Sequence, residues 1–128
     1  MLVTEEKSLY MNKPIAYLEN DDFNSQGQLL INTNLPVVIL IQASWCSYCT
    51  KVKPIFQEFA DKTQGKIFCA TIQIDGDRKS EQLLGYRIPK LFPDIEGIPT
   101  YILYINGQNI SKKISSNIEI KALFDFVK

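Results

Sequence analysis

The feature that most restricts the fold of this chain is a pair of cysteines, Cys46 and Cys49, that follows a run of apolar residues. The run VVILIQA, residues 37–43, is rich in β-branched side chains and unbroken, which is typical of a strand covered on both faces. From residue 46 to 63 apolar side chains recur at the three-and-four spacing of an amphipathic helix. The cysteines therefore lie where a buried strand passes into a helix. Residues three apart on a helix share one face, so the two sulfurs can come within reach of a disulfide with little backbone movement.

The start of a helix favours a thiolate at Cys46. Free backbone amides there, such as that of Cys49, point toward the sulfur, and the helix dipole favours negative charge. An effect of ~1 to 2 kcal/mol lowers a cysteine pKa by about one unit from ~8.5. Cys46 is predicted to attack a disulfide, and Cys49, one turn further in, to resolve the mixed disulfide. The alternative is an inert pair or part of a metal site, although one CxxC supplies only two of the four ligands that zinc prefers.

The composition excludes several other classes of function. A chain of 128 residues, 45% of them hydrophobic, fits one domain, and its zero net charge lacks the basic footprint of a nucleic-acid or membrane-surface binder. The absence of histidine excludes Ser-His and Cys-His catalysis and histidine-bound metals. We expect no cofactor, no metal, no membrane contact and a monomer. No apolar stretch approaches the ~20 residues that a membrane-spanning helix needs. Charged residues 5–7 stand where a signal peptide would be apolar, so we expect a cytoplasmic protein.

The remaining segments predict an α/β fold, with a central mixed sheet flanked by helices. Residues 1–13 are polar and unpatterned and are interpreted as an added N-terminal arm, and 14–128 as the domain. The NGQ sequence at 106–108 predicts a hairpin turn. The other predicted elements are strands at 15–18, 66–74, 100–105 and 109–114, a short helix at 80–84, a loop at 85–97 and a closing helix at 118–127.

Three spaced motifs resemble the thioredoxin family. The first is WCSYC itself. Pro54, five residues after Cys49, matches the proline that kinks the active-site helix of thioredoxins, and Ile98 and Pro99 in GIPTYILYINGQ match the family's cis-proline dipeptide. The resemblance spans most of the chain. It implies a thioredoxin fold and a thiol-disulfide oxidoreductase that acts on protein disulfides and is recycled by a separate reductase or oxidase.

The resemblance also implies roles for the residues around the cysteine pair. Ile98 and Pro99 would pack against the disulfide and leave backbone groups free to pair with a substrate. Trp45 matches the exposed tryptophan beside the nucleophile and, with Tyr48, would line the docking surface.

The sequence departs from the family both within the WCSYC motif and at two positions outside it. Ser47 and Tyr48 replace the usual Gly-Pro and look like a glutaredoxin dipeptide, which leaves a glutathione-dependent reductase as an alternative function. Leu40 and Thr71 stand where thioredoxins usually carry a buried aspartate and its lysine partner. No side chain is then assigned to take the proton of Cys49, and we predict a slow, pH-sensitive resolving step.

Other residues receive structural interpretations. The loop at 85–97 is longer than the thioredoxin connection and is expected to flank the substrate groove. A second alternative is a binding or assembly module that uses Trp45, Pro99 and this loop, with an incidental dithiol. Cys69, within a predicted strand, is interpreted as a small buried hydrophobe, and Lys53 as part of the solvent-exposed face of the first helix.

Overall fold

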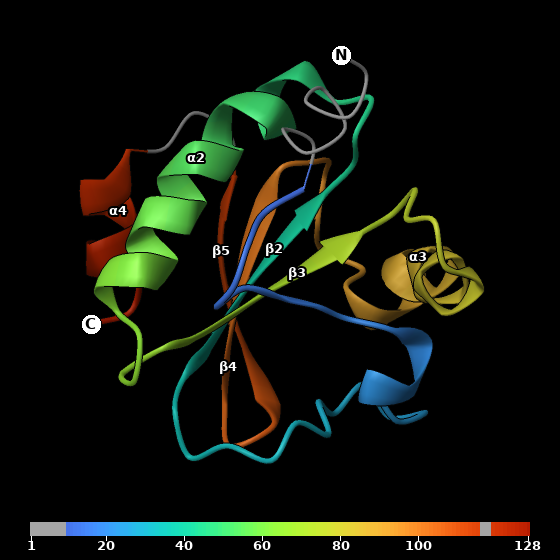
Figure 1. Cartoon of the computed structure of the whole chain (residues 1–128). Helices are drawn as coiled ribbons and strands as arrows, with labels where there is room; N and C mark the ends of the chain where they lie inside the picture. Colours follow the sequence, from blue (N-terminus) through green and yellow to red (C-terminus); the bar gives the residue numbers. More distant parts are fainter. Residues whose placement is uncertain (1–9, 116–118) are drawn as a thin grey trace.

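The structure is a computed structural model that describes residues 10–115 and 119–128. Within these residues one sheet has five strands in the order β1-β3-β2-β4-β5 (Figure 1). The strands β1, β3 and β2 are parallel, and β4 and β5 are antiparallel to their neighbours. The elements are β1 (Ala16–Tyr17), η1 (Asn20–Asp22), β2 (Val37–Gln42), α2 (Ser47–Lys62), β3 (Phe68–Gln73), α3 (Lys79–Leu91), β4 (Thr100–Ile105), β5 (Gln108–Ser115) and α4 (Ile120–Phe126). The predicted fold class, a mixed sheet flanked by helices, is confirmed.

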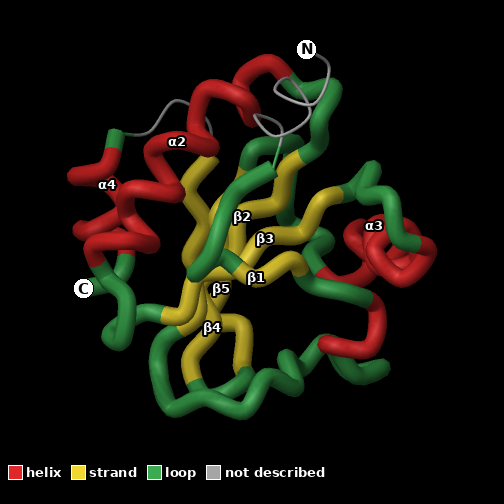
Figure 2. The backbone as a smooth tube through the Cα atoms, in the orientation of Figure 1, coloured by secondary structure: helices red, strands yellow, loops and turns green. Residues whose placement is uncertain are grey.

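Helices cover both faces of the sheet, with α2 and α4 on one side and α3 on the other (Figures 1 and 2). Every residue of β2 is buried because this strand lies in the middle of the sheet. Val38 and Leu40 belong to the core beneath α2, and Ile39 and Ile41 to the core beneath α3, as the alternation of side chains along a strand requires. The apolar run within residues 37–43, in which Gln42 is the one polar residue, is thus explained by burial on both faces.

The prediction of a short helix at 80–84 followed by a loop at 85–97 is wrong, because α3 continues to Leu91. Gly85 lies inside this helix, where a Cβ would stand 2.8 Å from the carbonyl oxygen of Ile74, so glycine lets α3 lie close to the end of β3. Pro89 falls in the last turn of α3, where its missing N–H removes only one helical bond. Packing against the sheet overrides two residues that ordinarily break helices.

The hairpin between β4 and β5 is confirmed. Asn106 and Gly107 have φ values of 54° and 78°, the left-handed conformations that a two-residue hairpin turn requires. Thr100 pairs with Ile41 of β2 at the other end of β4. The segment before Thr100 therefore lies next to the C-terminal end of β2.

The predicted N-terminal arm is described only in part, since residues 1–9 lie outside the described residues. Met11 is buried in the core beneath α2, and its amide donates to the Tyr17 hydroxyl at 2.7 Å. The Asn12 amide donates to Oε1 of Gln57 on α2, also at 2.7 Å. Residues 10–13 thus pack against the helix that begins at the cysteine pair.

Candidate active site

The two cysteines lie at the N-terminus of α2, where the end of β2 delivers them. Cys46 is the N-cap residue, and its Sγ accepts a hydrogen bond from the Cys49 backbone amide at 3.1 Å. The two residues form a disulfide, with their Cα atoms 5.2 Å apart. Cys46 is 8% exposed and Cys49 is fully buried. The expected juxtaposition of the sulfurs at a helix start is therefore present, and only the first cysteine reaches the surface.

Ile98, just before β4, lies against this pair. The Ile98–Pro99 peptide bond is cis, and the Ile98 carbonyl oxygen lies 3.9 Å from the Cys46 Sγ. Ile98 packs on the small cluster that contains Ala43 and both cysteines. The antiparallel pairing of β4 with β2 is what joins segments fifty-two positions apart.

Two aromatic side chains project beside Cys46. Trp45 is 70% exposed, and Tyr48 is also exposed, with the Lys51 Nζ 5.4 Å from its ring centroid. Trp45 and Ile98 line an apolar cavity of about 410 Å³, whose other wall is formed by the end of α3 and the loop that follows, including Ile88, Pro89, Phe92 and Pro93. The extension of α3 beyond its predicted end therefore builds one side of the surface around the cysteine pair.

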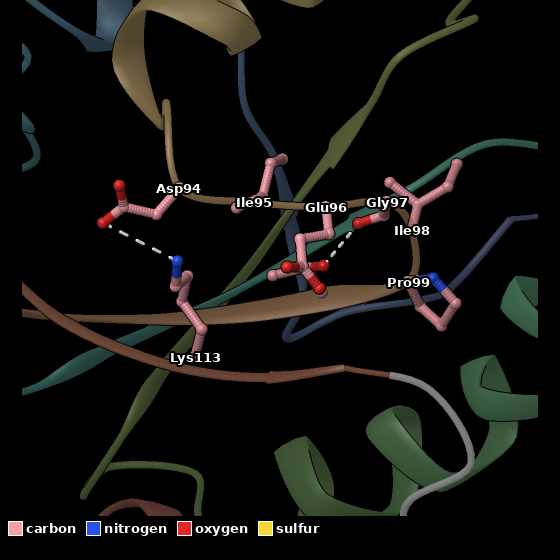
Figure 3. Close-up of a pocket in the computed structure, with 8 residues that line it drawn as sticks. Asp94, Ile95, Glu96, Gly97, Ile98, Pro99 and Lys113 are labelled. Atoms are coloured by element: carbon pink, nitrogen blue, oxygen red, sulfur yellow. Dashed lines mark hydrogen bonds and ion pairs between the residues drawn. The ribbon is translucent and has the colours of Figure 1, made fainter.

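A second cavity, of about 480 Å³, is lined by Ile98 and Pro99 (Figure 3). Its walls carry the charged side chains of Asp94, Glu96 and Lys113. Asp94 and Lys113 point toward each other in Figure 3, and their charged atoms are 3.7 Å apart. The loop beside the site is thus 92–99, shorter than the loop predicted at 85–97, and the last turn of α3 precedes it.

Pro54 lies within α2, on its exposed side, and does not end the helix. The helix continues for eight residues beyond it, to Lys62. Its apolar stripe, which includes Val52, Phe56 and Phe59, is buried against the sheet. This packing fixes the position of the helix start that carries the cysteines.

The structure corrects the interpretation of Lys53, which is only 4% exposed. It lies four residues after Cys49 and three before Phe56, on the buried stripe of α2 rather than on the exposed face. Burial lowers the pKa of Lys53, and the negative charge of Asp75 opposes this shift. The spacing relative to Cys49 and Phe56 was visible in the sequence, but a lysine is ordinarily assigned to the solvent side of a helix.

Two buried glutamines were not singled out by the sequence. Gln42 and Gln73 are the last residues of β2 and β3 and lie opposite each other in the parallel ladder. The Gln42 Nε2 donates to the Thr71 Oγ1 at 3.3 Å, and the Gln73 Nε2 donates to the Asp75 Oδ1 at 3.3 Å. Within the described part of the chain, the Oε1 atoms of both glutamines have no hydrogen-bond partner.

Asp75 lies just after β3, next to the loop that leads to the cysteines. It accepts hydrogen bonds from the backbone amide of Ser44, at 3.0 Å, and from the Ser44 hydroxyl. Burial raises the pKa of Asp75, but the hydrogen bonds from Ser44 and Gln73 together lower it below its usual value. A negative charge is therefore held close to the site.

Leu40 and Thr71, which stand where thioredoxins usually carry a buried aspartate and its lysine partner, are joined by a hydrogen bond. Leu40 is fully buried, and Thr71 lies beside it on β3. The Thr71 hydroxyl donates to the Leu40 carbonyl at 2.7 Å. Neither side chain accepts a proton near neutral pH.

Residues 10–115 and 119–128 hold neither a metal-binding cluster nor a membrane-spanning helix. No group of three or more cysteine, aspartate or glutamate side chains there is placed to hold a metal ion. None of the helices in this part of the chain combines the length and apolar character needed to cross a membrane.

A buried strand that leads into a CxxC pair at a helix N-terminus, with a proline segment against the outer sulfur, defines a domain for thiol-disulfide exchange. The family model for thioredoxin matches residues 14–128. The chain therefore belongs to the thioredoxin family and is a thiol-disulfide oxidoreductase.

Curated relatives agree with this assignment. The chain is 37% identical to the thioredoxin-like protein 453L of Invertebrate iridescent virus 6, over 79% of this chain and 83% of the relative. It is 28% identical to a thioredoxin H-type of Oryza sativa subsp. indica, over 80% and 75% of the two chains. A thioredoxin of Haemophilus influenzae is 24% identical, over 80% and 84%.

Proposed function

We propose that this protein exchanges disulfides with other proteins, with Cys46 as the nucleophile and Cys49 as the resolving thiol. The observation that carries the proposal is the asymmetry of the pair. Cys46 caps α2, where the Cys49 amide donates to its sulfur, and it is the cysteine that reaches the surface. An incoming disulfide can therefore meet Cys46 but not the buried Cys49.

In the reducing direction the cycle has two exchange steps. The Cys46 thiolate attacks one sulfur of a substrate disulfide, and the other substrate sulfur leaves as a thiolate. The Cys49 thiolate then attacks the Cys46 Sγ, forming the Cys46–Cys49 bond and releasing the second substrate thiolate. The substrate disulfide is reduced by two electrons and the pair is oxidised, so an external reductase must return it to the dithiol.

The docking surface proposed for the substrate surrounds Cys46. Trp45 and Tyr48 supply exposed aromatic area, and Ile98, which precedes Pro99 through a cis peptide bond, lies against the reactive sulfur. Exposed aromatic side chains beside a cavity are common anchors for protein partners.

The test of the proposed function is catalysis of insulin reduction by dithiothreitol. The wild-type protein is expected to accelerate the reaction, and Cys46→Ser to proceed at the uncatalysed rate, because the attacking thiolate is gone. The measurement is the rate at which the reduced insulin chains precipitate. A wild-type rate equal to that of dithiothreitol alone would overturn the proposal.

Trp45→Ala is expected to weaken docking without changing the chemistry of the cysteines. An exposed aromatic anchor is worth ~1 kcal/mol, so kcat/KM for insulin should fall about fivefold. The rate of attack on a small aromatic disulfide should change less than about twofold, because such a reagent needs little docking surface. Leu30→Ala is the control, since Leu30 is exposed and follows Leu29, which bonds to Gly107 at the far end of the β4–β5 hairpin. An equal loss in both assays would contradict a docking role.

A further inference from the structure

We propose that Lys53 takes the proton from Cys49 during the resolving step, an inference that rests on the proposed function of the cysteine pair. The sequence left this step without a proton acceptor, because Leu40 and Thr71 offer none. The structure supplies a buried amine on the same face of the same helix. No other lysine of α2 is buried among its described residues.

The first support is the position of Lys53 along α2. Residues four apart on a helix have their Cβ atoms roughly 5 to 6 Å apart. Cys49, Lys53 and Phe56 form one buried line along the helix, with Cys49 at its first turn. A flexible four-carbon side chain that starts one turn from Cys49 can bring its amine to the thiol or to a water bound beside it.

The second support is a set of oxygen atoms able to receive an ammonium group. Gln42 lies two residues after Leu40, and its amide bonds to Thr71, so its side chain lies on the sheet face that α2 covers. The neighbouring Gln73 lies two residues after Thr71 and faces the same way. Each glutamine has an Oε1 atom, buried and unpartnered within the described residues, that accepts hydrogen bonds but cannot donate them. Buried acceptors of this kind favour a protonated amine close by.

The third support is the balance of charge around the amine. Three titratable groups enter this balance: Cys49, one turn away on the same helix, Asp75 after β3, whose charge acts on Lys53, and Tyr101 on β4, which belongs to the core cluster beneath α2. Burial raises the pKa of Tyr101, so this residue stays neutral. Burial lowers the pKa of Lys53, which increases its neutral fraction, while Asp75 stabilises the ammonium that forms after proton transfer. Burial and the charge of Asp75 therefore act in opposite directions on the proton affinity of Lys53.

The proposed step conserves protons and electrons. The proton of the Cys49 thiol passes to the neutral Lys53 amine, which becomes an ammonium. The Cys49 thiolate attacks the Cys46 Sγ, the Cys46–Cys49 bond forms, and the bond from Cys46 to the substrate sulfur breaks. The substrate sulfur leaves with the electron pair and is protonated by solvent, and Lys53 later returns its proton to water.

The experiment separates attack from resolution by mixing the reduced protein with an equimolar amount of 5,5′-dithiobis(2-nitrobenzoic acid). Attack by Cys46 releases the first aryl thiolate at a rate that depends on reagent concentration, and resolution by Cys49 releases the second at a rate that does not. All proteins carry Cys69→Ala, so that only the pair reacts. Lys53→Met is compared with Lys62→Met, which removes an exposed lysine from the same helix.

In Lys53→Met the resolving rate near neutral pH should fall at least about tenfold, while the attack rate changes less than about twofold. As the pH rises, the parent rate should level off once Lys53 is neutral, and the variant rate should keep rising with hydroxide. Lys53→Arg should also be slow, because arginine keeps the charge but cannot accept a proton. Lys62→Met should match the parent in both phases.

Three results would overturn the role of Lys53: an unchanged resolving phase in Lys53→Met, an unchanged pH profile, or a parent-like resolving rate in Lys53→Arg. Thermal unfolding checks that each variant folds, and Lys53→Gln provides a second uncharged variant for the same pH profile. A parent protein without an attack phase would instead overturn the proposed function. The two failures are therefore distinguishable.

Discussion

Replacing Cys49 with serine should stop turnover and leave the substrate attached to Cys46. The variant keeps the helix start and the cysteine that reaches the surface, so it should still attack a disulfide. The resulting mixed disulfide then has no internal thiol to break it. Insulin reduction should fall roughly a thousandfold, as expected when a group that acts covalently is removed. Mass spectrometry of the protein after reaction should locate the adduct on Cys46.

Cys69→Ala is the matched control for this experiment because it removes the third thiol of the chain. Cys69 is buried in β3, and burial raises the pKa of its thiol to about 12, so it should not take part in exchange. Turnover in this variant should stay within about twofold of the wild type. Substantial turnover by Cys49→Ser, or an adduct located on Cys69, would contradict the assigned roles.

Phe56→Ala should produce a large loss of stability. Phe56 is fully buried, and its ring centroid lies 5.7 Å from that of Tyr101 and 6.3 Å from that of Phe59. Removing such a ring leaves a cavity and costs about 3 to 5 kcal/mol. In a domain of this size the midpoint of thermal unfolding should fall by about 10 to 20 °C. The measurement is thermal unfolding of the oxidised protein by circular dichroism.

Tyr86→Ala is the aromatic control for stability, because Tyr86 on α3 is 84% exposed. Its free energy of unfolding should change by less than about 0.5 kcal/mol. A similar loss in both variants would show that the fold does not depend on the core between α2 and the sheet. Packing of α2 would then not be what fixes the position of the cysteines.

Local patterns were sufficient for most elements of the fold. The apolar run at 37–43 could be satisfied only by a strand buried on both faces, and the helical spacing after Cys46 only by a helix with one buried side. The Asn106–Gly107 pair predicted the hairpin turn equally well, because asparagine and glycine readily adopt the left-handed conformations that both residues have there. The extent of α3 was missed because Gly85 and Pro89 favour a loop, and only contact with the sheet reverses that preference.

The sequence by itself determined that Cys46 and Cys49 meet at a helix start, since a spacing of three residues on a helix is a local property. Tertiary structure alone decided what surrounds them. Pairing of β4 with β2 brings Ile98 to the outer sulfur, and packing of α2 on the sheet turns Lys53 inward toward the face that carries Gln42. Such contacts join distant positions, and a lysine becomes buried only where the surrounding fold covers it.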